Sequence, residues 1–184
     1  ARITDRPIRP LFPEGYRNDV QVNNMVLSAD GENETDILSV NAASAALHIS
    51  DIPFMGPVGC VRVGRINGEF VINPTHTQRK ESDLDLIYAG TRERFLMMEG
   101  GADEISEEDF LAAMKFGHAE VVKIVDAQHE LRRMLGKPEK VITEVAPDAE
   151  KMAFLYANGE SALRKALLIA DKLERQNAVT AIKE

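Results

Sequence analysis

The strongest constraint on the fold of this chain is a series of strand patterns between residues 61 and 98. Residues 61–66 (VRVGRI) alternate in polarity, and residues 69–72 (EFVI) resume the pattern after Asn67-Gly68. An Asn-Gly pair between two such runs is the sequence signal of a two-residue type I′ hairpin. Residues 84–90 and 95–98 predict two further strands, the last of them ended by a Gly-Gly pair. The sequence therefore predicts a β-sheet as part of the fold.

Helical patterns lie on both sides of this block. Residues 37–49 are helical in composition and follow a good N-cap at Thr35 or Asp36. The small residues within 42–46 allow this helix to approach a sheet closely, so we expect it to be buried. A longer helix opens at Ser106 with a pattern close to a capping box. At about 29 residues and about 1.5 Å of rise per residue, it would span about 44 Å.

The strand signals disappear in the last part of the chain. Residues 138–146 are polar and predict a linker. Residues 147–184 predict only helices, the first stopped near Asn158-Gly159 and the second covering 163–173. The predicted fold class is α+β for residues 1–137, followed by the start of an all-helical segment.

The charge of the chain is unevenly distributed. The net charge of the 184 residues is −8, but residues 1–17 hold four arginines against two acidic residues and so carry +2, which leaves −10 for the remainder. Net acidity argues weakly against wholesale nucleic-acid binding. No apolar run approaches the roughly 20 residues that cross a bilayer, which excludes an integral membrane protein. The single cysteine excludes an intrachain disulfide framework.

The first residues are rich in arginine and proline and include no initiator methionine or apolar signal region. We therefore expect the sequence to come from the middle of a longer chain. Pro7, Pro10 and Pro13 predict an extended, stiff segment rather than a helix. After it, Val20-Gln21-Val22 alternates as a half-buried strand does, with a change of phase at Asn23-Asn24 that a bulge would allow.

Three arginines in this opening segment are candidate binding residues. Arg2, Arg6 and Arg9 are spaced by four and three residues in a segment that proline stiffens. A guanidinium group binds phosphate oxygens through two parallel hydrogen bonds, so a rigid row of arginines suits a phosphate backbone. The alternative is a set of internal ion pairs with Asp5 and other nearby carboxylates, and the residues alone leave both open.

Other candidate groups have simpler interpretations. His118 and His129 are 11 residues apart on the long helix, about 16 Å along its axis, which is too far to share a metal ion. Cys60 has no histidine in a nucleophile motif, so we expect a buried structural thiol. Residues 56–59 (GPVG) lack the lysine of a phosphate-binding loop and predict a turn.

Asp83 and Asp85 point to the same face of one predicted strand, about 7 Å apart. Two such carboxylates are able to share a hard cation, and the alternative is a solvated strand face.

The order of several long motifs resembles the polynucleotide phosphorylase family over essentially the whole chain. The opening fifteen residues are similar to the segment after the arginine-bearing loop of the first core in that family, and Asp171–Arg175 resembles its helical linker domain. The other similar motifs are Asp30–Asn33, Ala42–Leu47, Ile52–Gly59, Arg62–Gly64, Ile66–Gly68, Asn73–Thr75 and Leu84–Thr91.

The resemblance implies a specific fold and activity. The fold would be an RNase PH-like core, of the ribosomal protein S5 domain 2-like type, with its first strands missing over residues 1–137, a linker at 138–146 and the start of the all-helical domain at 147–184. The family forms cytoplasmic homotrimers with two such cores and KH and S1 RNA-binding domains in each chain. It degrades single-stranded RNA, including mRNA, from the 3′ end with inorganic phosphate and Mg²⁺, and it releases nucleoside diphosphates.

The resemblance also assigns roles to residues. Arg2, Arg6 and Arg9 match arginines that line the RNA path, and Arg62 matches another arginine involved in RNA handling. Asp83 falls where the second core has a catalytic aspartate, but Thr77 replaces its partner acid. One carboxylate cannot do the work of the pair.

We therefore expect no catalytic residue and no metal ligand in this chain, with Mg²⁺ held by the second core, and a role in guiding RNA and building the trimer. The alternatives are a stand-alone, active phosphorolytic core of the RNase PH type and a pure structural scaffold.

Overall fold

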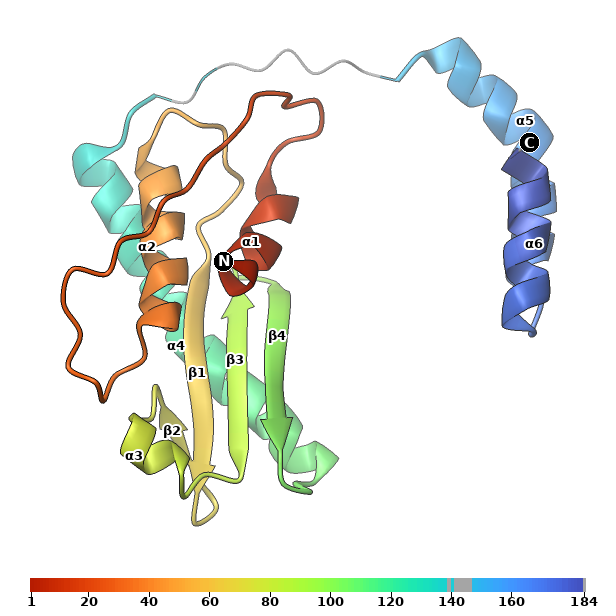
Figure 1. The fold of residues 1–184 in the computed structure, drawn as a ribbon. Coiled ribbons are helices and arrows are strands. Elements are labelled where there is room, and N and C mark those ends of the chain that lie inside the picture. Colours follow the sequence, from red (N-terminus) through yellow and green to blue (C-terminus); the bar gives the residue numbers. More distant parts are fainter. Residues whose placement is uncertain (139, 141–146, 184) are drawn as a thin grey trace. The chain divides into compact units, whose positions relative to one another are not determined.

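The computed structural model describes residues 1–138, 140 and 147–183. They form two compact units, one within residues 1–140 and the other within residues 147–183. The first unit contains a sheet with helices on both faces, and the second contains two helices (Figure 1). The linker predicted at 138–146 lies, apart from residues 138 and 140, outside the described residues.

The sheet of the first unit has four antiparallel strands. They are β1 (Gly59–Ile66), β2 (Glu69–Ile72), β3 (Leu84–Gly90) and β4 (Phe95–Ala102), in the order β2-β1-β3-β4. The predicted hairpin is confirmed, because Ile66 pairs with Glu69 and both residues of the Asn67-Gly68 turn have positive φ, as a type I′ turn requires.

Strand β4 extends further than the sequence predicts. Gly100 and Gly101 pair with Leu86 and Asp85 instead of ending the strand. A Cβ atom on Gly100 would lie 2.0 Å from the backbone oxygen of Asp85, so glycine is needed at Gly100 for the close approach of the two backbones.

Two helices cover opposite faces of the sheet. Helix α2 (Thr35–Ile49) packs on the side that includes Cys60, Ile87 and Ala89, and α4 (Glu107–Leu135) packs on the side that includes Val61 and Val63. Both helices were predicted, and α4 has its expected N-cap at Ser106. The N-cap of α2 is Glu34, and Thr35 is the first residue of the helix. The N-cap was expected one or two residues later, at Thr35 or Asp36.

The opening segment is helical, so the prediction of an extended segment is wrong. Helix α1 spans Arg2–Ile8, and a 3-10 turn (η1) follows at Arg9–Leu11. Proline removes one backbone donor, but its fixed φ is compatible with a helix. Pro7 and Ile8 are buried, with Ile3 and Leu11 packed against the same core, and this burial of an apolar stripe outweighs the local effect of proline.

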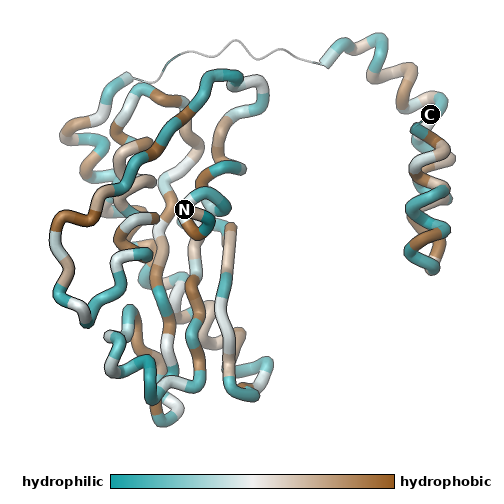
Figure 2. Tube along the Cα trace, in the orientation of Figure 1, coloured by the Kyte–Doolittle hydropathy of each residue, from teal (hydrophilic) through white to brown (hydrophobic). Residues whose placement is uncertain are grey.

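The strand predicted from Val20 is also wrong. Residues 18–30 have no regular secondary structure, and none of the four described strands pairs with them. A strand is stable only beside a partner, which local alternation does not supply. Instead, this segment contains hydrophobic residues, drawn brown in Figure 2. Two of them, Met25 and Leu27, are more than four-fifths exposed. A short helix, α3 (His76–Arg79), begins with a capping box between Thr75 and Gln78.

The second unit consists of α5 (Ala149–Leu167) and α6 (Lys172–Lys183). The expectation of helices is confirmed, but their bounds are wrong. Helix α5 continues through Asn158-Gly159, where a helix end was predicted, and the break between α5 and α6 falls within the range 163–173 that was predicted as one helix. The side chain of Asn158 donates a hydrogen bond to the Phe154 carbonyl within the helix, and one glycine costs only about 1 kcal/mol in a helix. In the described part of the chain, no helix has the length and apolarity that a membrane span requires.

Candidate functional site

Helix α1 and the following turn bring three arginines onto one surface. Residues 2, 6 and 9 are spaced by four and three, which places them along one face when the backbone is helical. Arg9 itself has helical φ and ψ, so it continues the row. All three arginines are exposed. The spacing that suggested a rigid track therefore describes a helix face, and the structure brings Arg2, Arg6 and Arg9 together.

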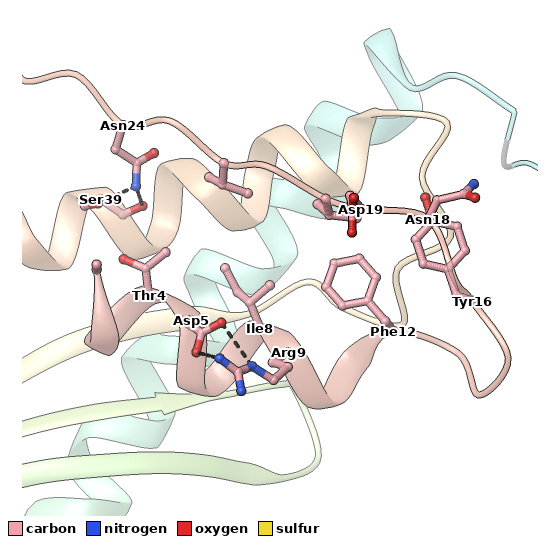
Figure 3. A pocket seen from close by; sticks show the side chains of 13 residues that line it. Thr4, Asp5, Ile8, Arg9, Phe12, Tyr16, Asn18, Asp19, Asn24 and Ser39 are labelled. Atoms are coloured by element: carbon pink, nitrogen blue, oxygen red, sulfur yellow. Dashed lines mark hydrogen bonds and ion pairs between the residues drawn. The ribbon is translucent and has the colours of Figure 1, made fainter.

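Two of these arginines are paired with carboxylates. Arg6 Nη1 lies 3.4 Å from Glu99 Oε2, an ion pair that links α1 to β4. Arg9 donates from Nε to Asp5 Oδ1 at 3.1 Å and from Nη2 to Asp5 Oδ2, so both carboxylate oxygens are engaged (Figure 3). Both pairs are accessible to solvent, where an ion pair contributes only about 0–1 kcal/mol.

Shallow grooves flank this helix on two sides. The first has a volume of about 380 Å³ and lies between the arginine face and β4, with Arg6, Arg9, Leu96 and Met97 in its lining. The second, of about 720 Å³, lies between α1, the segment of residues 12–24 and α2 (Figure 3). Its lining combines apolar and polar side chains, namely Ala1, Thr4, Asp5, Ile8, Arg9, Phe12, Tyr16, Asn18, Asp19, Val20, Val22, Asn24 and Ser39.

Arg62 lies apart from these three arginines. It is on β1, its side chain is only 6% exposed, and it forms ion pairs with Asp36 (Nη2 to Oδ2, 2.6 Å) and with Asp85. Asp85 also accepts from Arg79, which binds Glu34 as well. Of the roles open to Arg62, the structure therefore shows two buried ion pairs, and the small exposed part of the residue lines a groove of about 230 Å³ with Glu34 and Asn73.

Asp83 and Asp85 do not converge on a common cation position. Asp83 Oδ2 accepts from Arg65 Nε at 3.1 Å, and the same arginine binds Asp109 of α4. Each aspartate has an arginine partner, so the two carboxylates are not a free pair of ligands for Mg²⁺. Both side chains remain about one-third exposed, at 36% for Asp83 and 37% for Asp85, so this part of the strand face is both ion-paired and partly solvated. The hydrogen bond from Ser106, followed by the contact with Arg65, lowers the pKa of Asp109.

Thr77, at the position where the resemblance places a partner acid for Asp83, contacts another carboxylate. Its hydroxyl group donates to a carboxylate oxygen of Glu32 at 3.0 Å. The contact ties the start of α3 to the loop before α2.

The remaining candidate residues have structural surroundings. Among the described residues, no group of three or more His, Cys, Asp or Glu side chains could hold a metal ion. His118 contacts the Tyr88 hydroxyl group, and His129 contacts His48. Cys60 is fully buried, and burial raises the pKa of its thiol to about 12. The prediction of a structural thiol is confirmed.

Two contacts escaped the sequence analysis. Glu99 meets Arg6 across 93 positions, and His48 meets His129 across 81. Neither separation leaves a local signal. The helical spacing of the three arginines was a signal, but the prolines outweighed it in the prediction.

Comparison with known proteins shows that the chain is similar to 3′ exoribonucleases. A model of the "3′ exoribonuclease family, domain 1" matches residues 1–53, and one of the same family's domain 2 matches residues 56–120. Similar relatives are the polyribonucleotide nucleotidyltransferases of Thermomicrobium roseum (50% identity, 100% of this chain, 23% of the relative) and of Methylacidiphilum infernorum (46%, 100% and 26%). That of Akkermansia muciniphila is 48% identical, with 100% of this chain and 26% of the relative covered.

The chain thus spans about a quarter of the length of the curated relatives it matches. Among solved structures, the crystal structure of rice (Oryza sativa) Rrp46 has a TM-score of 0.49 at 17% identity, over 55% of this chain and 48% of that chain.

Proposed function

Because this chain belongs to the 3′ exoribonuclease family, we propose that it is the RNA-guiding part of a polynucleotide phosphorylase. The whole protein would shorten single-stranded RNA, including mRNA, from its 3′ end. Inorganic phosphate would attack the phosphorus of the terminal phosphodiester linkage, the 3′ oxygen of the shortened RNA would leave, and the last nucleotide would be released as a nucleoside diphosphate. This chain would hold the RNA and contribute to a homotrimer in the cytoplasm, without catalysing the reaction.

One observation carries this proposal: Arg2, Arg6 and Arg9 are exposed at helical spacing, and Arg6 and Arg9 line a groove shared with Leu96 and Met97 of β4. Guanidinium groups bind phosphate oxygens strongly because two parallel hydrogen bonds add to the charge. Phosphate contacts position a nucleic acid without reading its bases. Such a surface suits an enzyme that must move along RNA of any sequence.

The surroundings of Asp83 support a non-catalytic role. Its Oδ2 atom is bound by Arg65, its Oδ1 atom is buried away from solvent, and Thr77 offers no second carboxylate. A phosphorolytic centre that uses Mg²⁺ needs free carboxylate oxygens as ligands, since this hard cation selects oxygen donors. We therefore assign the metal and the chemical step to another part of the whole protein.

The experiment that tests this proposal measures the affinity of the 184-residue chain for a fluorescent 12-nucleotide oligoadenylate at low salt. Arg6→Ala and Arg9→Ala should each weaken binding, and the salt dependence should become less steep because fewer phosphates are neutralised. Arg164→Ala is a matched control. Arg164 pairs with Glu160 at a spacing of four residues and is 77% exposed, against 76% for Arg9.

The alternatives give different results in the same samples. Phosphate-dependent release of nucleoside diphosphate by the purified chain would favour a stand-alone active core. The ion pairs of Arg6 and Arg9 favour a pure scaffold as the second candidate, since both are satisfied within the chain. If the chain is a pure scaffold, Arg6→Ala and Arg9→Ala should each lower the melting temperature slightly. Their affinity for RNA should then equal that of the Arg164→Ala variant.

A further inference from the structure

We infer that Asp5 and Glu99 compete with RNA phosphate for the arginine face, and that Asp5 is the stronger competitor. This inference rests on the proposed function and concerns what limits the affinity of the chain for RNA. The three arginines of the face are accompanied by these two carboxylates. A phosphate group that approaches the face therefore meets guanidinium groups that already have anionic partners.

Asp5 occupies the part of Arg9 that a phosphate would use. The carboxylate of Asp5 accepts from both Nε and Nη2, one oxygen to each nitrogen (Figure 3). Two oxygens of a phosphate group bind a guanidinium group in the same two-bond geometry. A phosphate group that binds the Nε–Nη2 edge of Arg9 must therefore displace Asp5, and one that binds the remaining N–H groups lies beside the Asp5 charge.

Glu99 leaves more of Arg6 accessible. The contact uses one nitrogen of Arg6, Nη1, at a long distance of 3.4 Å. Within the described residues, the Nε and Nη2 atoms of Arg6 make no hydrogen bond, and the side chain is 45% exposed. A phosphate group is able to bind that side of Arg6 while the contact with Glu99 persists.

The two carboxylates should consequently differ in their effect on RNA affinity. Removing the charge of Asp5 frees a two-bond edge of Arg9, whereas removing that of Glu99 weakens only one long contact, at Nη1 of Arg6. Exposed ion pairs of this kind change an equilibrium by about two- to fivefold. Asp5→Asn should tighten RNA binding within that range, and Glu99→Gln by less than twofold.

The test compares dissociation constants of the full chain and its variants for the 12-nucleotide oligoadenylate. Glu160→Gln is the matched control, because Glu160 also pairs with an arginine four residues away and is equally exposed, 45% against 47% for Asp5. It removes one negative charge without touching the arginine face. Circular dichroism melting of each variant confirms that the chain remains folded.

A double-mutant cycle identifies Arg9 as the route of the effect. Tighter binding by Asp5→Asn that disappears when Arg9→Ala is also present supports the inference. If Asp5→Asn behaves like Glu160→Gln while Arg9→Ala still weakens binding, the inference is wrong and the proposed function survives. If Arg6→Ala and Arg9→Ala both leave affinity unchanged, the proposed function itself fails.

Discussion

His48 Nε2 and His129 Nδ1 lie 3.2 Å apart and join α2 to α4 (Figure 1). The rings meet edge to face, with centroids separated by 4.9 Å. Arg132, three residues beyond His129, donates to the His48 carbonyl near the end of α2. His48 is buried, and its Nδ1 atom has no hydrogen-bond partner within the described residues. The site thus places a neutral imidazole beside a permanent positive charge.

This arrangement predicts that the first unit loses stability in acid. Burial, then the charges of His129 and Arg132, lower the pKa of His48 from 6.5 to about 4. Between these values the unfolded chain binds the proton and the folded chain resists it. The free energy of unfolding should therefore fall as pH drops from about 6.5 to 4, by an amount on the order of 3 kcal/mol. Urea titrations at pH 7.5, 6, 5 and 4 measure the change.

Two histidine variants identify the group that makes the free energy of unfolding depend on pH. His48→Gln removes the buried titrating group and should flatten the dependence between pH 6.5 and 4. His76→Gln removes an imidazole that is 43% exposed and serves as the control for the loss of a histidine outside the core. Equal slopes in His48→Gln and the unaltered chain would show that other groups cause the acid sensitivity.

The elements predicted correctly are those with local signals. Asn67-Gly68 marks the hairpin because its residues adopt positive φ readily, and Ser106 marks the start of α4 because its side chain caps the backbone. Both features depend on residues within a few positions of one another. Helix α1 was missed because its stability depends on burying Ile8 against distant strands.

The difference between local signals and tertiary packing also explains why the burial of Arg62 could not be predicted. The alternating pattern places Arg62 on the face opposite Val61 and Val63, which is the polar face of a strand in isolation. In the structure α2 covers that face, so Arg62 is buried and needs the carboxylates of Asp36 and Asp85. Which face a helix covers is a property of the assembled fold, and a local pattern does not contain it.

Two adjacent glycines of β4 should respond differently to the same substitution. In Gly100→Ala the new Cβ would lie 2.0 Å from the Asp85 oxygen, so the strands must separate, whereas Gly101 has no neighbour within 4 Å of that position. We expect Gly100→Ala to lower the free energy of unfolding by about 1–3 kcal/mol or more. Gly101→Ala should change it by less than about 0.5 kcal/mol. Equal urea midpoints for the two variants would contradict the strand pairing.

Cys60 should be inert in the folded chain. Burial raises the pKa of its thiol to about 12, and only the thiolate reacts with disulfide reagents. At pH 8, Ellman's reagent should release no thionitrobenzoate within minutes from the native protein, and one equivalent after unfolding in guanidinium chloride. Rapid reaction of the native chain would mean that the interface between β1 and α2 opens readily.

The buried ion pairs of Arg62 predict a loss of stability that is separate from RNA binding. Arg62→Ala would leave Asp36 and Asp85 without this guanidinium group, although both carboxylates keep partial access to solvent. Breaking a fully buried pair costs about 3–5 kcal/mol, so we expect a loss of about 2–3 kcal/mol here. Urea unfolding measures it, with Arg164→Ala as the exposed counterpart that should lose less than about 1 kcal/mol. At a temperature where both variants are folded, Arg62→Ala should bind the oligoadenylate as the unaltered chain does. Weaker binding without a loss of stability would instead place Arg62 on the RNA path.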